Sequence, residues 1–80
     1  MEIVKTGHCP ASPVQMTYDP NNRYTALGLQ HMFDGATIRW HAATSGLEVL
    51  GIDIMLYPKD FIHLDTDGVA RIVRKDEVLD

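Results

Sequence analysis

Two Asp-Gly pairs, Asp34-Gly35 and Asp67-Gly68, each lie between stretches in which apolar and polar residues alternate. An Asp-Gly pair in that setting is the strongest short-range signal for a β-hairpin, because tight hairpin turns need a positive φ that glycine adopts at no steric cost. No other feature constrains the architecture of this chain as much. The two pairs predict two antiparallel hairpins within a small β-sheet protein.

The first pair suits a two-residue loop. In that register Leu29 lies opposite Trp40, and one side of the hairpin becomes almost wholly apolar. Because side chains alternate with a period of two, a shift by one residue would mix the two faces. The pattern therefore predicts that Trp40 belongs to the core.

A helix near residues 20–33 is the alternative for this region. Asp19 could cap such a helix with Pro20 at its first position, and Gly35 could end it. Gly28 would then lie inside the helix, at a cost of about 1 kcal/mol relative to alanine. The period-two alternation of apolar residues also favours a strand. The sequence therefore favours the hairpin, with the helix as its alternative.

The second pair suits a three-residue loop, Thr66-Asp67-Gly68, with its glycine in the left-handed conformation. This loop places Leu64 across from Ala70. It also places Ile62 across from Ile72, so that the apolar side chains share one face. A two-residue loop would oppose Leu64 to a charged residue, so the three-residue loop is predicted.

Elsewhere the alternation predicts a strand at residues 14–18, and residues 2–6 could form a terminal strand. Residues 47–57 are rich in Ile, Val, Leu and Met and are expected to be extended, with Gly51 suggesting a bulge or a sharp bend. We predict a single all-β domain spanning residues 1–80, with about five to seven antiparallel strands in a curled sheet or half-open barrel. An α+β fold is the alternative if the helix forms. The core is expected to contain the apolar side chains on one face of these strands: Leu27, Leu29, Phe33, Ile38, Trp40, Ile52, Ile54, Leu56, Ile62, Leu64 and Ile72.

Composition narrows the class of protein and its expected compartment. A hydrophobic fraction of 45% is ordinary for a globular chain and too high for a disordered one. The single cysteine, Cys9, excludes an intramolecular disulfide and favours a reducing compartment. The longest apolar stretch, residues 52–57, is too short to span a bilayer, and the first residues show no leader pattern. A cytoplasmic protein is expected.

The residues that could bind metal or act in catalysis form no site that the sequence reveals. The four histidines and Cys9 lack the paired spacings of structural metal sites. The segment 65–68 resembles a calcium loop only superficially, because its glycine stands at the fourth position and an EF-hand needs it at the sixth. A Cys9 nucleophile would need a base and an orienting group nearby; any of the histidines could be that base in principle, but nothing in the sequence pairs one of them with Cys9. We therefore predict no metal, no cofactor and no enzymatic activity.

A nucleic-acid interface has more support, but two observations oppose it. Arg39, Trp40 and His41 would lie together on one strand. Arg23 and Tyr24 would lie on the strand before it, and small β-barrels bind single strands by stacking bases on aromatic rings. The hairpin register, however, places Trp40 in the core, and the net charge of −4 opposes contacts with phosphate. No direct contact with nucleic acid is expected.

The acidic residues gather toward the end of the chain. Six of the eleven fall in the last 21 positions, namely Asp60, Asp65, Asp67, Asp76, Glu77 and Asp80. Basic residues interrupt this set, and acidic residues on a small domain commonly serve only solubility. The alternative is a negative surface that docks onto a basic groove, where opposite potentials raise the association rate and help to select the partner. These six are the predicted partner-binding residues.

The acidic surface and the lack of a catalytic constellation together predict a non-catalytic acidic protein-binding module. Its most specific form is an inhibitor that occupies the basic nucleic-acid-binding surface of a larger complex. Compact phage inhibitors of host nucleases and of CRISPR complexes belong to that functional class. One alternative is a structural or assembly subunit that self-associates through sheet edges. The other is a small β-barrel that binds single-stranded nucleic acid.

Overall fold

The structure is a computed structural model that describes residues 1–76, and this part of the chain forms two small antiparallel sheets and one short helix. One sheet has four strands in the order β1-β7-β6-β2, and the other has three in the order β3-β4-β5. The elements in chain order are β1 (Glu2–Lys5), β2 (Val14–Thr17), α1 (Thr25–Met32), β3 (Ile38–His41), β4 (Gly46–Val49), β5 (Ile54–Leu56), β6 (Phe61–Leu64) and β7 (Val69–Val73). The sheet-dominated fold that the sequence predicts is confirmed.

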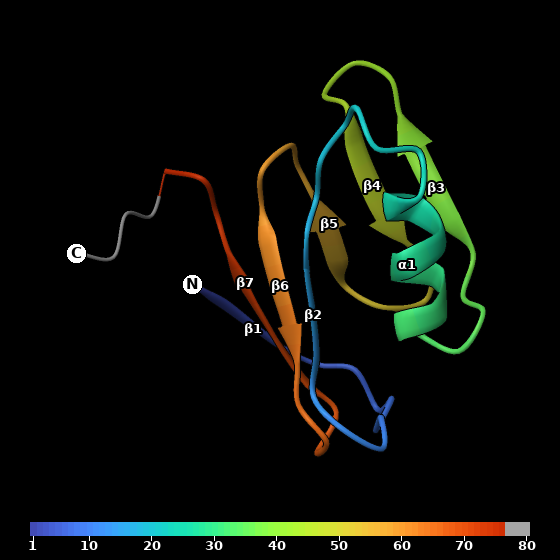
Figure 1. Cartoon of the computed structure of the whole chain (residues 1–80), viewed down its shortest axis with the longest axis vertical. Coiled ribbons are helices and arrows are strands. Elements are labelled where there is room, and N and C mark those ends of the chain that lie inside the picture. The colour runs from blue at the N-terminus through green and yellow to red at the C-terminus, as the bar shows by residue number, and fades with distance from the viewer. Residues whose placement is uncertain (77–80) are drawn as a thin grey trace.

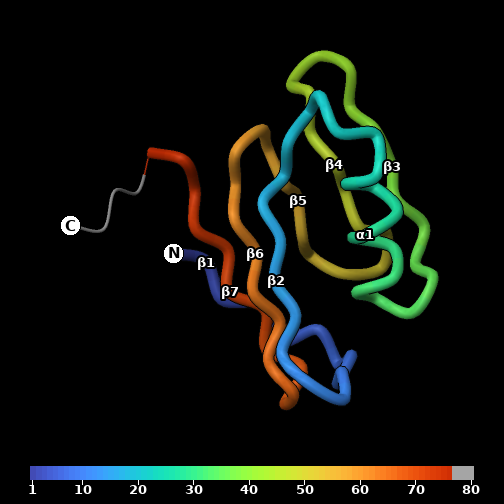
Figure 2. The backbone as a smooth tube through the Cα atoms, viewed as in Figure 1, coloured from blue at the N-terminus to red at the C-terminus, as the bar shows by residue number. Residues whose placement is uncertain are grey.

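The two sheets and the helix enclose one apolar core. Figure 1 shows the four-stranded sheet beside the three-stranded sheet, with α1 next to β2 and in front of β3 and β4. The tube in Figure 2 shows how the chain passes from β5 in one sheet directly into β6 in the other. Alternate residues of both sheets face inward and meet the buried side of the helix. The buried apolar side chains are Tyr18, Leu29, Met32, Phe33, Leu47, Val49, Ile54, Leu56, Ile62, Leu64, Ala70 and Ile72.

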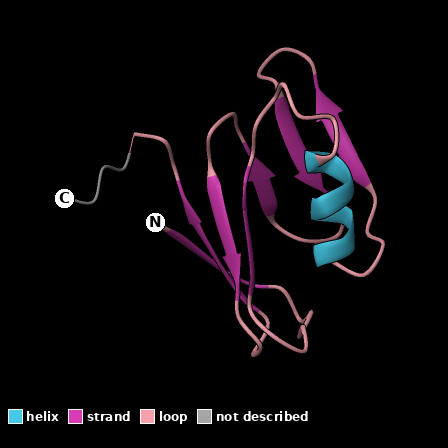
Figure 3. Ribbon diagram, viewed as in Figure 1, coloured by secondary structure: helices cyan, strands magenta, loops and turns pink. Residues whose placement is uncertain are grey.

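The first predicted hairpin is wrong, because residues 25–32 form the helix α1 (Figure 3). Leu29 and Met32 stand three residues apart and both point into the core, a spacing that only a helix places on one face. The pair Asp34-Gly35 ends this helix. Both residues have positive φ, and the Gly35 amide donates to the Gln30 carbonyl at 2.8 Å. The alternative prediction of a helix near residues 20–33 is therefore confirmed.

The helix begins later than the predicted cap at Asp19. The Asp19 carboxylate instead accepts the Asn21 amide at 2.9 Å, in a turn that precedes the helix. The helix starts after Tyr24, and no side chain caps it. Packing of the apolar face against the sheets therefore stabilises α1 more than its local sequence does.

Two residues of the predicted core are exposed instead. Leu27 is 50% exposed because it lies on the outer side of the helix, and Trp40 is 54% exposed because it lies on the edge strand β3. Trp40 does face the apolar side of its sheet, opposite Leu47, but β3 pairs with β4 and not with residues 27–33. Of the other predicted core residues, seven are buried, and Ile38 and Ile52 pack against the core at its margin.

The stretch 47–57 is not one bent strand. It divides into β4 and β5, which pair with each other, and Gly51 stands in the turn between them with φ +85°. A glycine at positive φ thus makes a hairpin turn where the sequence suggested a bulge or bend.

The second predicted hairpin is confirmed in its register and its loop. Ile62 pairs with Ile72, and Leu64 pairs with Ala70. The Gly68 amide donates to the Asp65 carbonyl at 3.0 Å, which closes the three-residue loop. The local signal and the alternation of side chains agree at this site, so the sequence alone was sufficient.

Substituting Gly68 with alanine is expected to lower the free energy of unfolding by at least about 1–2 kcal/mol, the cost of a left-handed conformation for a residue with a Cβ. Its φ is +83°, and a Cβ would also lie 3.2 Å from the Cys9 sulfur. Gly7→Ala is the matched control, because Gly7 has φ +75° but no atom within 4 Å of its Cβ position. Urea unfolding should show a larger loss for Gly68→Ala. Equal losses would mean that contact with Cys9 adds nothing.

Candidate functional site

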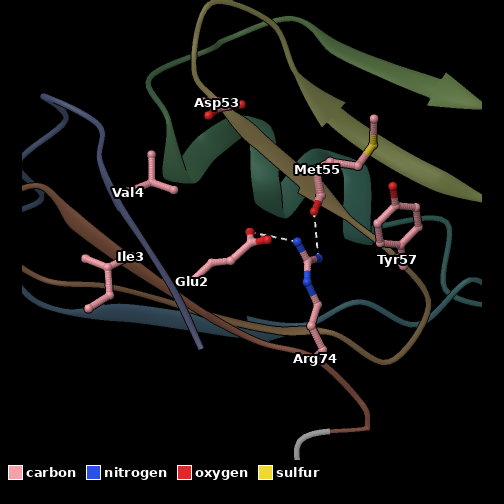
Figure 4. A pocket seen from close by; sticks show the side chains of 7 residues that line it. All are labelled: Glu2, Ile3, Val4, Asp53, Met55, Tyr57 and Arg74. Atoms are coloured by element: carbon pink, nitrogen blue, oxygen red, sulfur yellow. Dashed lines mark hydrogen bonds and ion pairs between the residues drawn. The ribbon is translucent and has the colours of Figure 1, made fainter.

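A cleft separates the outer strands of the two sheets on the side away from the helix. β1 is the edge strand of the four-stranded sheet, and β5 is an edge strand of the three-stranded sheet. Between them lies a hollow of about 580 Å³, shown from close by in Figure 4. We call it the β1–β5 cleft, and its lining residues are Glu2, Ile3, Val4, Asp53, Met55, Tyr57 and Arg74.

The edge of β1 offers backbone groups that no strand within residues 1–76 uses. The Thr6 amide donates to the Gly68 carbonyl at 2.9 Å, so Thr6 and Gly68 form a hydrogen-bonded pair. In an antiparallel ladder such pairs alternate, and Val4 opposite Ala70 is therefore another. The N–H and C=O groups of Ile3 consequently point away from β7, toward the open edge.

The edge of β5 is partly closed by a side chain. The Arg74 guanidinium donates to the Met55 carbonyl at 2.8 Å, so this carbonyl faces away from β4 and into the cleft. The same guanidinium donates to the Glu2 carboxylate at 2.7 Å. Arg74 stands directly after β7, and it therefore links the two sheets across one end of the cleft (Figure 4).

A buried carboxylate holds this arginine in place. Asp60 is 1% exposed, and its carboxylate accepts hydrogen bonds from Arg74 and from the Tyr57 amide, the latter at 2.8 Å. The guanidinium also lies over the Tyr57 ring, 5.4 Å from its centroid. Burial alone would lower the pKa of Arg74, but the hydrogen bonds and charges of Glu2 and Asp60 raise it above its ordinary value. Arg74 therefore stays cationic, and its charge is neutralised from within the protein.

The cleft keeps an excess of negative charge. Glu2 is half exposed although it touches Arg74, and Asp53 is exposed with no ion pair within the described part of the chain. A second hollow of about 510 Å³ adjoins the cleft around Tyr57 and Arg74, and its lining includes both Lys75 and Asp76, whose charges are opposite. A cationic group entering the cleft from solvent would meet carboxylates whose charge Arg74 only partly balances.

The structure divides the predicted acidic residues between two ends of the four-stranded sheet. Asp60 and Asp76 lie near the cleft, whereas Asp65 and Asp67 lie at the opposite end of β6, around the hairpin loop. Asp60 is buried and paired, so it cannot contribute to an exposed surface, contrary to the expectation from sequence. Glu77 and Asp80, the last two of the six, lie outside the described residues.

The carboxylates at the hairpin loop are partly used within the protein. Asp65 forms a 2.8 Å hydrogen bond with His63 and an ion pair with Arg71. The hydrogen bond with His63 lowers the pKa of Asp65 most, burial opposes it, and the contact with Arg71 lowers the pKa further. The Asp67 carboxylate accepts the Val69 amide at 3.2 Å and is otherwise exposed. The four of the six that lie within residues 1–76 therefore form no single acidic face.

Glu2, Asp53 and Arg74 were missing from the site that the sequence predicted. Each stands in a segment far from the other two along the chain, and only the pairing of β1 with β7 brings Glu2 to Arg74. No spacing in the sequence marks such a group. In the sequence, the one local indication of this site is Arg74, which directly follows the apolar strand β7.

Three of the four histidines, His8, His41 and His63, have separate partners in place of a shared site. His8 hydrogen-bonds with Asp34 at 3.0 Å, and His41 with Glu48 at 2.8 Å. Among residues 1–76, no group of three or more His, Cys, Asp or Glu side chains lies close enough together to hold a metal ion. In the same part of the chain, no helix has the length and apolar character needed to cross a membrane.

The β1–β5 cleft is thus equipped for binding. It offers an open strand edge, two accessible carboxylates and the apolar side chains of Ile3, Val4 and Met55. Its seven lining residues include no serine, cysteine or histidine. Comparisons of the chain with protein-family models, with curated proteins and with solved structures find no match.

Proposed function

We propose that this protein is a non-catalytic binding module and that its partner is a protein with a basic surface. The observation that supports this most directly is the β1–β5 cleft, in which an open strand edge adjoins the carboxylates of Glu2 and Asp53. An exposed strand edge binds extended segments through backbone hydrogen bonds, and the neighbouring side chains select among them. A segment of the partner that contains lysine or arginine fits both requirements.

The same geometry indicates how the segment would bind. Arg74 occupies the Met55 carbonyl, so the added strand pairs with β1 and its free groups at Ile3. A basic side chain of the partner then reaches Asp53 across the cleft. Its aliphatic stem would pack on Val4 and Met55, as long basic side chains do on apolar surface.

Within this class we propose an inhibitor of a nucleic-acid-handling complex, comparable in role to phage-type anti-defence proteins. A net charge of −4 and exposed carboxylates match the basic groove with which such a complex holds DNA or RNA. Binding there would block access of the nucleic acid. The competing proposal is an assembly subunit, in which the edge of β1 pairs with a second copy of the chain.

Asp53→Lys is expected to weaken partner binding about tenfold or more, because it places a like charge opposite the basic segment of the partner. Asp67→Lys is the matched control, since it changes the net charge equally but lies at the hairpin loop. Each form would be used to capture partners from the native host, followed by mass spectrometry. The affinity for the captured protein would then be measured at several salt concentrations.

The two variants also separate the possible outcomes. Loss of binding with Asp67→Lys, and not with Asp53→Lys, would place the contact at the hairpin loop and contradict the cleft. Capture of nothing but further copies of the chain would contradict the inhibitor and support the assembly subunit. Partner binding that does not weaken with added salt would exclude a contact driven by these charges.

A further inference from the structure

A second surface, on the helix side of the three-stranded sheet, has the opposite character to the cleft. Trp40 on β3 is 54% exposed, and Tyr24, just before α1, is 65% exposed. Trp40 and Arg23 line a hollow of about 130 Å³ between β3 and the start of the helix. Its full lining is Tyr18, Pro20, Asn22, Arg23, Thr25, Ala26, Trp40 and Leu47. We call it the Trp40 hollow.

The floor of the hollow is fixed, whereas two groups at its rim are free to bind. The Tyr18 hydroxyl donates to the Ser45 carbonyl at 2.7 Å, and the Thr25 hydroxyl donates to the Asp19 carbonyl at 3.2 Å. Within residues 1–76, by contrast, the Trp40 indole and the Arg23 guanidinium take part in no hydrogen bond or ion pair. Arg23 lies only over the Tyr24 ring, 5.9 Å from its centroid.

The charge of this region favours an anionic ligand. No carboxylate lines the Trp40 hollow. Arg23 lines it and has no ion pair within the described residues, whereas Arg71 and Arg74 are both paired with carboxylates. Arg39, although next to Trp40 on β3, lies opposite Glu48 on the other face of the sheet. An arginine without a carboxylate partner beside an exposed indole can contact a phosphate group.

The size of the hollow suits a group as small as a single ring. Its volume of about 130 Å³ lies well below the roughly 300–1,000 Å³ of pockets that enclose a whole small ligand. A ring that enters it can stack on Trp40 while the groups attached to the ring remain in solvent.

We propose that the Trp40 hollow binds single-stranded nucleic acid, with one base stacked on Trp40 and an adjacent phosphate on Arg23. A nucleotide combines a planar ring with an anion in every repeating unit, which is the combination that these two residues recognise. Of the two features of the sequence that oppose direct contact, the expected burial of Trp40 is absent, because this side chain is exposed. The net charge of −4 keeps the binding weak and strongly dependent on salt. The site is separate from the β1–β5 cleft and does not depend on its function.

The only tryptophan of the chain makes this proposal directly measurable. Titration of the protein with a ten-nucleotide oligothymidine at low salt is expected to quench the Trp40 fluorescence and to reach saturation. Inorganic polyphosphate supplies the charge without a base, and it should leave the fluorescence unchanged. Absence of quenching at strand concentrations up to about 1 mM, beyond the usual range of non-specific affinities, would refute the proposal.

Substitutions of Trp40 and Arg23 then test the two proposed contacts separately, the stacked base and the bound phosphate. With a fluorescently labelled strand, Trp40→Ala is expected to weaken binding roughly 5- to 150-fold, the effect of removing one stacked base. Arg23→Gln should reduce the salt dependence of the binding constant by about the 0.7 units in log–log slope that one phosphate contributes in single strands. Lys5→Gln on β1 removes an equal charge far from the hollow and should change the affinity less than twofold.

Three results would contradict this assignment. One is an equal loss of affinity with Lys5→Gln and Arg23→Gln, because binding would then depend on overall charge alone. Another is quenching by polyphosphate as strong as by oligothymidine. The third is a pair of observations: Trp40→Ala abolishes binding of a protein partner, and no oligonucleotide quenches the Trp40 fluorescence. The hollow would then be a contact site for protein. Circular dichroism and thermal unfolding of each variant confirm that the fold is retained.

Discussion

Replacing Arg74 with methionine is expected to lower the free energy of unfolding by roughly 3–5 kcal/mol, the usual cost of removing one partner from a buried ion pair. Asp60 is 1% exposed, and without Arg74 its carboxylate keeps only the hydrogen bond from the Tyr57 amide. The link from Arg74 to Met55 and Glu2 across the two sheets is lost as well. Equilibrium unfolding in urea, followed by circular dichroism, measures the effect.

Arg71→Met provides the matched control for this prediction. Arg71 also pairs with an aspartate, but both side chains of that pair are partly exposed, so the loss should stay below about 1 kcal/mol. The double variant Asp60→Asn, Arg74→Met removes the buried charge and should recover part of the lost stability. If Arg74→Met cost no more than Arg71→Met, the Asp60–Arg74 pair would not stabilise the junction of the sheets.

Leu29→Ala is expected to cost about 2–5 kcal/mol, because Leu29 is fully buried and its truncation leaves a cavity between the helix and the sheets. Leu27→Ala should cost less than about 1 kcal/mol, since Leu27 lies on the outer side of α1 and is half exposed. Urea unfolding of the two variants compares them directly. The pair also tests the helix itself, because in a hairpin both leucines would face the core and both substitutions would be severe.

The contrast between the two Asp-Gly pairs shows how far local sequence determines this fold. Both pairs supply positive φ, and that conformation ends a helix as readily as it turns a hairpin. At Gly68 the flanking strands pair with each other, so local pattern and tertiary structure agree. At Gly35 the preceding segment packs between β2 and β3 instead, and this long-range packing outweighs the local cost of Gly28.

The candidate sites were harder to predict than the fold, for the same physical reason. Asp60 looks like a surface residue in the sequence, and only the position of Arg74 explains its burial. Trp40 lies on the predicted side of its strand, but its exposure depends on β3 being an edge strand. Whether a side chain at the margin of a small core is buried depends on which strand lies at the edge of the sheet. The alternation of apolar and polar residues does not determine that strand order.

The pairing of β1 with β7 has a consequence for how the chain acquires its fold. These strands are hydrogen-bonded neighbours although nearly the whole chain separates them, and the contact from Glu2 to Arg74 spans 72 positions. During synthesis β1 leaves the ribosome long before β7 exists. The four-stranded sheet, and with it the β1–β5 cleft, can therefore be completed only after translation has passed residue 74, whereas the local hairpin of β4 and β5 can form earlier. Any partner that recognises the cleft therefore binds the chain only after residue 74 has been synthesised, and not a shorter nascent chain.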